Sequence, residues 1–201
     1  MLKGHLKDAM SQLREHGPLL RFSEVLALGV HRDTLWRLRD EGHVEQVSRG
    51  LYRLSKGPPL EHSDLVTVAK RVPGAVVCMV SALALHELTT QIPHVVEIAV
   101  KRGRRRPGFD YPPMRVYWWS AAALSEGVET RNLGGVDVRV TNAERSVADA
   151  FRYRHQLGID LALEALHAWK EQRGSRPEAL LAAARTVRMD RVIRPYLQAI
   201  L

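Results

Sequence analysis

The 201-residue sequence has a single cysteine and no long apolar run, internal repeat or low-complexity segment. A lone cysteine cannot form an intrachain disulfide, and Cys78 lies in the apolar stretch Val76–Val80, which predicts a buried, inert thiol. No stretch approaches the roughly 20 apolar residues that a membrane span needs, and the N-terminus lacks the apolar core of a signal peptide. We therefore expect a cytoplasmic protein with no membrane partner.

The charge balance favours a polyanionic partner. The sequence has 30 Lys and Arg residues against 22 Asp and Glu, a formal charge of +8. Each phosphate that a basic side chain neutralises releases condensed counterions, which favours nucleic-acid binding. Residues 1–60 hold ten basic residues against seven acidic ones, residues 61–120 eight against five, and residues 121–201 twelve against ten. The surplus is spread along the chain, so a basic patch has to be identified from local patterns. A basic composition can also serve solubility alone, and the composition by itself does not separate the two explanations.

The first 57 residues predict a winged helix-turn-helix domain. The segment Ser55-Lys56-Gly57-Pro58-Pro59 interrupts regular structure, since proline lacks an amide donor. Before it, the pattern predicts helices over 4–16, over Ser23–Leu28 with Ser23 as N-cap, and over His31–Glu41 with Gly42 just beyond its end. Strands over His43–Val47 and Leu51–Leu54 follow, joined by a tight turn at Ser48-Arg49-Gly50. This order of elements is that of a winged helix.

Residues 60–201 predict a second domain with mixed strands and helices. Strands are expected over Val76–Val80, His94–Val100, Met114–Trp119, Val128–Leu133 and Val136–Val140, with a helix over Ser81–Leu88 and a hairpin turn at Gly134-Gly135. Four helices are then expected near 142–156, 160–173, 177–186 and 189–200, the first and third opened by capping boxes at Thr141–Glu144 and Ser175–Glu178. The predicted fold class is α+β: an N-terminal winged helix-turn-helix followed by a mixed α+β domain that ends in a run of helices.

The third predicted helix has the features of a recognition helix. Advancing about 100° per residue groups His31, Leu35 and Leu38 on the side that can pack against the first two helices. The opposite side presents long polar side chains near the helix N-terminus, where base edges are read, and arginine is the best reader of guanine. In this helix and the adjoining hairpin we expect DNA contacts from Arg32, Asp33, Thr34, Trp36, Arg37, Ser48 and Arg49.

Each of these residues has a distinct expected role. Arg32 and Arg37 can donate to guanine, Asp33 can accept from cytosine, and Thr34 can hold a phosphate. Trp36 either packs on a sugar or thymine methyl, or is half-buried against the wing. Arg49, at the hairpin tip, can enter the minor groove or hold a phosphate. Any one of these arginines taken alone is better explained as a solvated surface charge, and it is their coincidence with the helix order that indicates DNA contact.

A second basic cluster lies in the predicted second domain. The segment Lys101-Arg102-Gly103-Arg104-Arg105-Arg106 places five cations in six positions, a density that predicts an exposed loop. We regard Lys101, Arg102, Arg104, Arg105 and Arg106 either as a solvated loop or as a contact for phosphate or an acidic partner.

The sequence offers no convincing catalytic or metal site. Nine histidines are present, but none has the spacing of a zinc motif. Glu97 and Lys101 have the wrong spacing for a nuclease carboxylate–lysine arrangement. Arg145 and Asp149 are best explained as an i,i+4 ion pair. We therefore expect no enzyme, cofactor or metal, although a metal-dependent nuclease that uses a winged helix for targeting remains the alternative, and a pure interaction protein is a third.

Several segments resemble a known family. The N-terminal run Gly29–Leu38, together with Gly42 and Ser48–Leu54, resembles the AbiEi-type antitoxins of abortive-infection (type IV) toxin–antitoxin systems. The segments Ser81–Thr89 and Val140–Asp149 are also similar to blocks of that family. The resemblance extends from the first helix to about residue 157, and the remaining residues have no motif of this kind.

The resemblance implies a regulatory function. It implies a DNA-binding domain that represses its own operon by binding double-stranded operator DNA, joined to a domain that counters a nucleotidyltransferase-like toxin. The sequence leaves open whether the toxin is contacted directly, whether the protein binds DNA as a dimer or cooperatively, and which operator it recognises.

Overall fold

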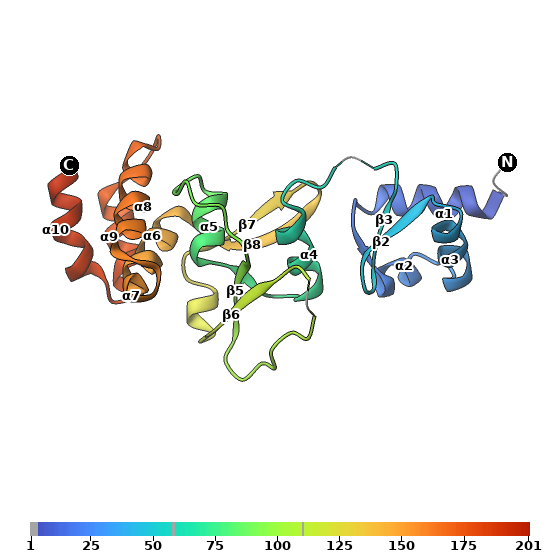
Figure 1. Ribbon diagram of the computed structural model, residues 1–201, viewed down its shortest axis with the longest axis horizontal. Coiled ribbons are helices and arrows are strands. Elements are labelled where there is room, and N and C mark those ends of the chain that lie inside the picture. The colour runs from blue at the N-terminus through green and yellow to red at the C-terminus, as the bar shows by residue number, and fades with distance from the viewer. Residues whose placement is uncertain (1–3, 58, 110) are drawn as a thin grey trace. The chain divides into compact units, whose positions relative to one another are not determined.

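The computed structural model describes residues 4–57, 59–109 and 111–201, and Figure 1 shows its helices and strands. They form two compact units. The first comprises the residues up to Pro73 together with Asn132–Val138, and the second comprises Gly74–Arg131 and Arg139–Leu201. The domain boundary that we expect at 57–60 stays a prediction, and Pro58 within it lies outside the described residues.

The first unit contains the winged helix-turn-helix. Its elements are α1 (Gly4–Glu15), β1 (Leu20–Arg21), α2 (Phe22–Ala27), α3 (Arg32–Asp40), β2 (Val44–Ser48), β3 (Leu51–Leu54) and α4 (Ser63–Arg71). The three strands form an antiparallel sheet in the order β1-β3-β2. The predicted helices and hairpin are thus present, and β1 and α4 are additional elements that the sequence pattern did not indicate.

One apolar cluster fixes the position of α3. Leu6 and Leu13 of α1, Val25 of α2, and Leu35 and Leu38 of α3 are all at most 4% exposed and pack together. Burying one leucine side chain contributes about 1.5–3 kcal/mol to folding. The cluster therefore holds α3 with its opposite face turned to solvent.

The start of α2 differs from the sequence prediction. Ser23 lies inside the helix, and Arg21 is the N-cap residue. The Glu24 carboxylate accepts hydrogen bonds from the backbone N–H of Arg21 at 2.7 Å and from its guanidinium at 3.0 Å. These two bonds, together with the pairing of β1 with β3, start the helix at Phe22 rather than after a serine cap.

A mixed sheet of five strands lies mainly in the second unit, and the residues around its last hairpin, Asn132–Val138, are grouped with the first unit. The elements of this region are β4 (Val76–Val77), α5 (Met79–Leu85), β5 (Val96–Lys101), β6 (Met114–Trp119), the 3₁₀ turn η1 (Ala122–Leu124), β7 (Val128–Leu133) and β8 (Val136–Thr141). The strand order is β6-β5-β4-β8-β7. β4 runs antiparallel to β5 and parallel to β8, and β5 runs parallel to β6.

The prediction for the apolar run Val76–Val80 needs correction. The strand expected over Val76–Val80 ends at Val77, because Cys78 caps α5 and Met79 takes a left-handed backbone conformation with φ of 51°. Cys78 itself is fully buried, as expected, and burial raises the pKa of its thiol well above the usual value. An apolar run of five residues cannot by itself distinguish a strand from the start of a buried helix.

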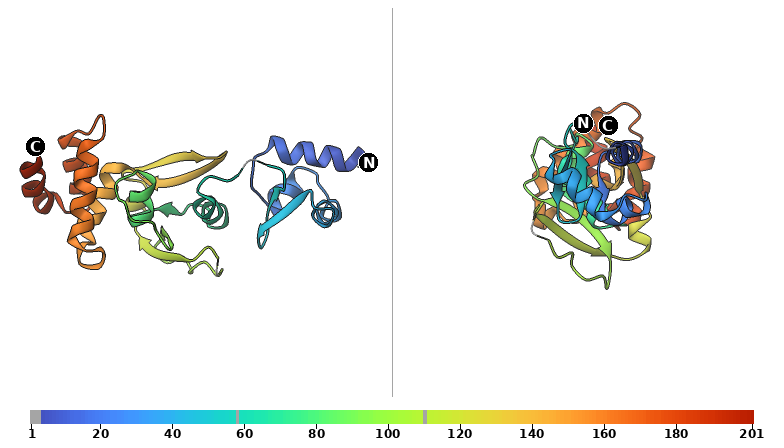
Figure 2. Two further views of the ribbon diagram at one scale, coloured as in Figure 1. Left: turned by 45° about the horizontal axis from the view of Figure 1, so that its top comes forward. Right: turned by 90° about the vertical axis from the view of Figure 1, so that its right-hand side faces the viewer.

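A helical layer completes the second unit. It consists of α6 (Ala143–Arg152), α7 (Arg154–Leu157), α8 (Ile159–Glu171), α9 (Pro177–Thr186) and α10 (Asp190–Ile200), which lie together in Figure 2. Phe151, Leu166, Trp169, Leu180 and Ile193 are at most 1% exposed and form the centre of its core. The run of helices predicted for the C-terminal region is present, with the first predicted helix divided at Tyr153.

The caps of α6 and α9 are not the predicted ones. Asn142 caps α6 by accepting a hydrogen bond from the backbone N–H of Arg145 at 2.9 Å, while Thr141 ends β8 and its hydroxyl bonds Ser146 at 2.8 Å. Arg176 is the N-cap residue of α9, and the Ser175 hydroxyl donates to the carbonyl of Lys170 at 3.1 Å.

The architecture is α+β, with an N-terminal winged helix-turn-helix, a mixed α+β region and C-terminal helices, as the sequence predicted. None of the described helices is long and apolar enough to cross a membrane.

Candidate nucleic-acid interface

Helix α3 is fixed at its N-terminus by His31. The His31 ring nitrogen Nδ1 accepts a hydrogen bond from the backbone N–H of Asp33 at 3.3 Å, which satisfies one of the amides that a helix leaves unpaired. His31 is therefore an exposed cap, not part of the packed face where the helical wheel placed it. Leu35 and Leu38 are fully buried as expected.

The solvent-facing side of α3 presents most of the predicted reading residues. Arg32, Asp33, Trp36 and Arg37 are exposed, whereas Thr34 is half-buried. The Arg32 guanidinium lies 5.6 Å from the centre of the Trp36 ring, and its Nε lies 3.5 Å from the Asp33 carboxylate. Trp36 is 42% exposed, so it offers an accessible ring edge as well as a platform for Arg32.

A carboxylate pairs with Arg37, the second arginine that the sequence predicts to contact bases. The Nε atom of Arg37 donates to Glu41 at 2.7 Å, one helical turn further along the chain. Both side chains are more than one-third exposed, so this pair contributes little to stability. Its effect is to orient the guanidinium and to place a negative charge beside it. Any phosphate or guanine bound by Arg37 would have to compete with Glu41.

The wing presents one exposed arginine at its tip. Arg49 is exposed, and Gly50 has φ of +76°, a left-handed conformation that glycine adopts without strain. The carbonyl of Gly50 accepts a hydrogen bond from the backbone N–H of Phe22 at 2.8 Å, which ties the turn to the start of α2. Ser48 differs from Arg49, because its hydroxyl is buried and has no hydrogen-bond partner among the described residues.

Sequence reasoning missed a second basic residue near the wing. Arg71 ends α4, and its pKa is lowered by burial and by the positive charge of Arg49. An effect of this kind requires the two guanidinium groups to be close. The signal in the sequence was the pair Lys70-Arg71 at the end of an amphipathic segment. Lys70 bonds Glu24 at 3.3 Å.

The basic cluster of the second unit lies at the surface. Lys101 is the last residue of β5 rather than part of a loop, and the four arginines follow it without regular structure. All five cationic side chains are exposed. The backbone carbonyl of Arg104 accepts a hydrogen bond from the indole N–H of Trp118 at 3.0 Å, which ties this segment to β6. The structure thus provides exposed cations, and their role as phosphate or partner contacts stays a prediction.

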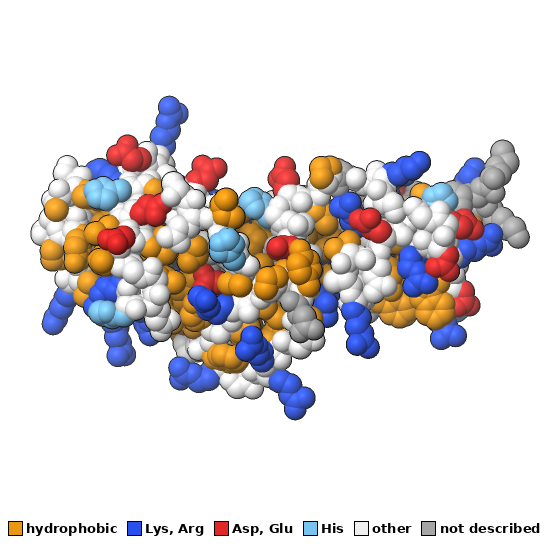
Figure 3. All heavy atoms as spheres, viewed as in Figure 1, with side chains coloured by type: hydrophobic (Ala, Val, Ile, Leu, Met, Phe, Trp, Pro, Cys, Tyr) orange, Lys and Arg blue, Asp and Glu red, His pale blue; other side chains and the backbone are white. Residues whose placement is uncertain are grey.

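On the face drawn in Figure 3, the Lys and Arg side chains are scattered over the surface rather than gathered in one patch. This agrees with the even charge balance along the sequence. The prediction of a nucleic-acid interface at α3 and the wing therefore rests on the geometry of these elements and not on an area of uniform charge.

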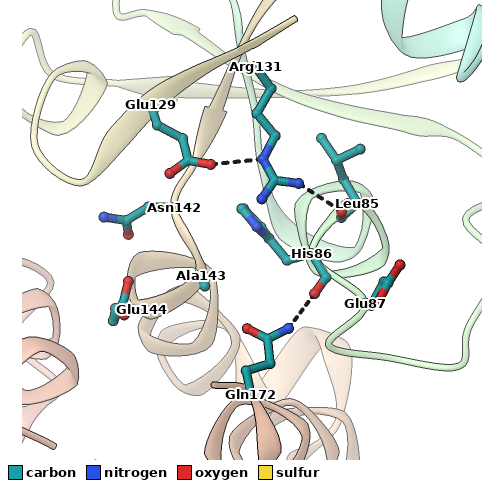
Figure 4. A pocket seen from close by; sticks show the side chains of 9 residues that line it. All are labelled: Leu85, His86, Glu87, Glu129, Arg131, Asn142, Ala143, Glu144 and Gln172. Carbon is teal, nitrogen blue, oxygen red and sulfur yellow. Dashed lines mark hydrogen bonds and ion pairs between the residues drawn. The ribbon is translucent and has the colours of Figure 1, made fainter. Parts of the chain in front are cut away.

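Polar residues also line a cavity of about 400 Å³ around His86 (Figure 4). Most of these groups are paired with one another. Glu129 bonds Arg131 at 2.9 Å, Arg131 donates to the carbonyl of Leu85 at 3.2 Å, and Gln172 donates to the carbonyl of His86 at 2.7 Å. Burial lowers the pKa of His86, whose ring bonds the carbonyl of Thr141 at 2.6 Å. Because these polar side chains bond one another and the backbone, we interpret them as groups that stabilise the fold.

The Glu97 carboxylate is buried and held by hydrogen bonds within the protein. It is 1% exposed and accepts hydrogen bonds from the backbone N–H of Val80 at 2.8 Å, the Tyr117 hydroxyl at 2.9 Å and Arg115 at 3.2 Å. Lys101 lies exposed at the end of the same strand. Over the described residues, no group of three or more His, Cys, Asp or Glu side chains is placed to hold a metal ion.

These features define the class of the N-terminal region as a winged helix-turn-helix with an exposed, arginine-bearing third helix. A comparison with protein families adds a particular assignment. Residues 8–55 match the family described as "Transcriptional regulator, AbiEi antitoxin". The resemblance predicted from the sequence is confirmed over these residues, which include α3 and the wing. No curated protein matches the chain.

A solved structure shares the fold. The chain is similar to the crystal structure of the RV2827C protein from Mycobacterium tuberculosis, with a TM-score of 0.57 and 12% sequence identity. The similarity covers 98% of this chain and 82% of that chain. It extends over the winged helix and the α+β region alike, so the combination of the two recurs in a second protein.

Proposed function

We propose that this chain is an antitoxin-type transcriptional regulator that acts by binding rather than by catalysis. In this proposal, α3 and the β2–β3 wing bind double-stranded operator DNA upstream of the protein's own operon and repress it. The remaining α+β region counters a nucleotidyltransferase-like toxin.

The observation that carries the DNA-binding part is the geometry of α3. A packed face of Leu35 and Leu38 holds the helix, and the opposite face presents Arg32 and Arg37 to solvent. Arg49 lies at the tip of the adjoining hairpin. A recognition helix beside a basic wing is the arrangement with which winged helices contact the major groove and the neighbouring backbone. The family match over residues 8–55 supports a regulatory function for the same segment.

Binding to the upstream region tests this part directly. The purified chain is titrated by fluorescence anisotropy with a labelled duplex from the region upstream of its gene and with an unrelated duplex of equal length. We expect tighter binding to the upstream duplex and a linear fall of log affinity with log salt. Equal affinity for both duplexes would contradict operator recognition, and metal-dependent cleavage of either duplex would favour the nuclease alternative.

The toxin-countering part requires a test of its own. Cells that express the toxin encoded beside this gene are complemented with the full chain or with its Arg32→Ala/Arg37→Ala variant. We expect both to restore growth, because those side chains lie on the DNA-facing surface of the first unit. If only the wild-type chain rescues growth, toxin control depends on repression. The proposal that the two regions act separately, one on DNA and one on the toxin, would then be wrong.

A further inference from the structure

A cavity of about 610 Å³ lies in the second unit, in the size range of small-molecule sites. Its lining comes from segments that are far apart in the sequence: the residue after β5, the end of β6, α6 and the turn after α9. Four arginines line it, namely Arg102, Arg145, Arg152 and Arg188. Among the described residues, the lining has the carboxylates of Glu126 and Asp149, so the cationic side chains outnumber the anionic ones two to one.

In the inner wall of the cavity, several contacts hold the Arg145 side chain in one position. Arg145 is 3% exposed, and its Nε donates to Asp149 Oδ2 at 3.0 Å while its Nη1 donates to the carbonyl of Glu126 at 2.8 Å. Its guanidinium lies 4.9 Å from the centre of the Trp119 ring. Gly127 has φ of +62°, and a Cβ there would lie 2.9 Å from the Cβ of Arg145. Only glycine permits this close approach, which fixes the stem of Arg145.

One acceptor in this wall has no partner. Asp149 is 1% exposed, and its Oδ1 atom is buried without a hydrogen bond among the described residues. Buried polar atoms without a partner are rare in native proteins, and each calls for a donor. Burial raises the pKa of Asp149 to about 6 against the opposing effect of Arg145. A ligand with an N–H group directed at Oδ1 would satisfy the atom.

The outer part of the cavity is cationic. Arg102, Arg152 and Arg188 are all exposed, whereas Arg145, Asp149 and Trp119 are buried. Guanidinium groups bind phosphate oxygens in a bidentate manner, and several around one opening are typical of phosphate recognition. The cavity therefore joins an outer anion-binding zone to an inner zone with an aromatic ring and an acceptor.

We propose that this cavity binds a nucleoside polyphosphate, with its phosphates among Arg102, Arg152 and Arg188 and its base directed toward Trp119 and Asp149. A nucleobase provides both the π-face and the N–H donors that the inner wall requires. An acidic peptide would instead bring carboxylates toward the buried Asp149, which is unfavourable. Duplex DNA cannot insert a base without unpairing it. The same nucleotide chemistry is present in a free nucleotide and at the end of a single strand.

Calorimetric titration of the 201-residue chain tests the proposal. The probes are ATP, GTP, CTP, UTP, inorganic tripolyphosphate and a single-stranded trinucleotide. We expect at least one nucleoside triphosphate to bind at least tenfold more tightly than tripolyphosphate, since only the former has a base. Preference for the trinucleotide over every triphosphate would assign the site to a strand end. Tripolyphosphate binding as tightly as the triphosphates, or the absence of binding by all probes, overturns the proposal.

A matched pair of charge reversals locates the site. Arg188 lines the cavity, whereas Arg185, also exposed and on the same segment, does not. Arg188→Glu is expected to weaken nucleotide binding at least tenfold, and Arg185→Glu, with the same change in net charge, less than twofold. An equal loss in both variants would show nonspecific attraction and contradict the proposed site. Circular dichroism on each variant confirms that the fold is retained.

Discussion

The α3 surface and the cavity of the second unit place arginines in opposite environments. On α3, Arg32 and Arg37 are exposed, with Arg32 over the Trp36 ring and Arg37 paired with Glu41 just beyond the helix end. In the cavity, Arg145 is buried, paired with Asp149 and stacked on Trp119. Exposed arginines such as those of α3 can change conformation to fit a DNA surface, whereas Arg145 is held in one geometry and shapes the inner wall of the cavity.

The largest expected effect is a loss of stability on removing a buried side chain that packs α3 against the first unit. Leu35→Ala deletes a fully buried side chain and should lower the free energy of unfolding by about 2–5 kcal/mol. DNA binding should fall with it, because the exposed face depends on the packed one. Urea denaturation followed by circular dichroism measures the loss. A change below about 1 kcal/mol would show that α3 is not held by this cluster.

The buried pair of the cavity should make stability depend on pH. With its pKa raised to about 6 from 3.8, Asp149 binds its proton more tightly in the folded state than in the unfolded state. This contribution is therefore fully present below about pH 4 and is lost as pH rises through about 6, by up to about 3 kcal/mol.

Asp149→Asn isolates this contribution, because asparagine keeps the shape of the side chain and cannot titrate. Denaturation midpoints are compared between pH 4 and pH 7 for both proteins. The wild type should lose stability relative to the variant across this interval. A constant difference between them would show that Asp149 does not titrate there.

The wing should contribute less to DNA affinity than α3 does, and its contribution should be the same for every DNA sequence. Arg49→Ala removes one exposed cation at the hairpin tip and should reduce the slope of log affinity against log salt by about one unit. The same loss is expected for upstream and unrelated duplexes, because backbone contacts do not distinguish sequences. A loss confined to the upstream duplex would mean that the wing reads bases.

The smallest expected effect is an increase in DNA affinity. Glu41 accepts a hydrogen bond from Arg37 at 2.7 Å and repels phosphate, so Glu41→Gln should strengthen DNA binding about threefold, corresponding to less than 1 kcal/mol. Asp40→Asn is the matched control, because Asp40 bonds Arg39 rather than a predicted reading residue. A gain that is equal in both variants would reflect net charge alone.

Local patterns in the sequence predicted the winged helix well, because periodicity and turn residues determine it. Leu35 and Leu38 marked the packed side of α3, and Gly50 marked the turn of the wing. β1 was not predictable, since its two residues become a strand only by pairing with Leu51 and Tyr52. The cap of α2 was mispredicted for the same reason.

Local sequence patterns could not predict the cavity of the second unit. The spacing of Arg145 and Asp149 correctly predicted an ion pair, now seen at 3.0 Å, but spacing on a helix does not reveal burial. Arg102 and Arg188 lie on other segments, and only the packing of α6 against the sheet and α9 brings them to one cavity. Sites assembled from distant segments require the tertiary structure.

The most direct test of the central claim is the specificity ratio, the affinity for the upstream duplex divided by that for an unrelated duplex, in the wild type and in the Arg32→Ala/Arg37→Ala variant. Each lost base contact should cost about 1–3 kcal/mol of discrimination. If α3 reads DNA, the variant should lose at least tenfold of this ratio while keeping its fold and part of its nonspecific affinity. An unchanged ratio in a folded variant would contradict the assignment of α3 as the recognition helix.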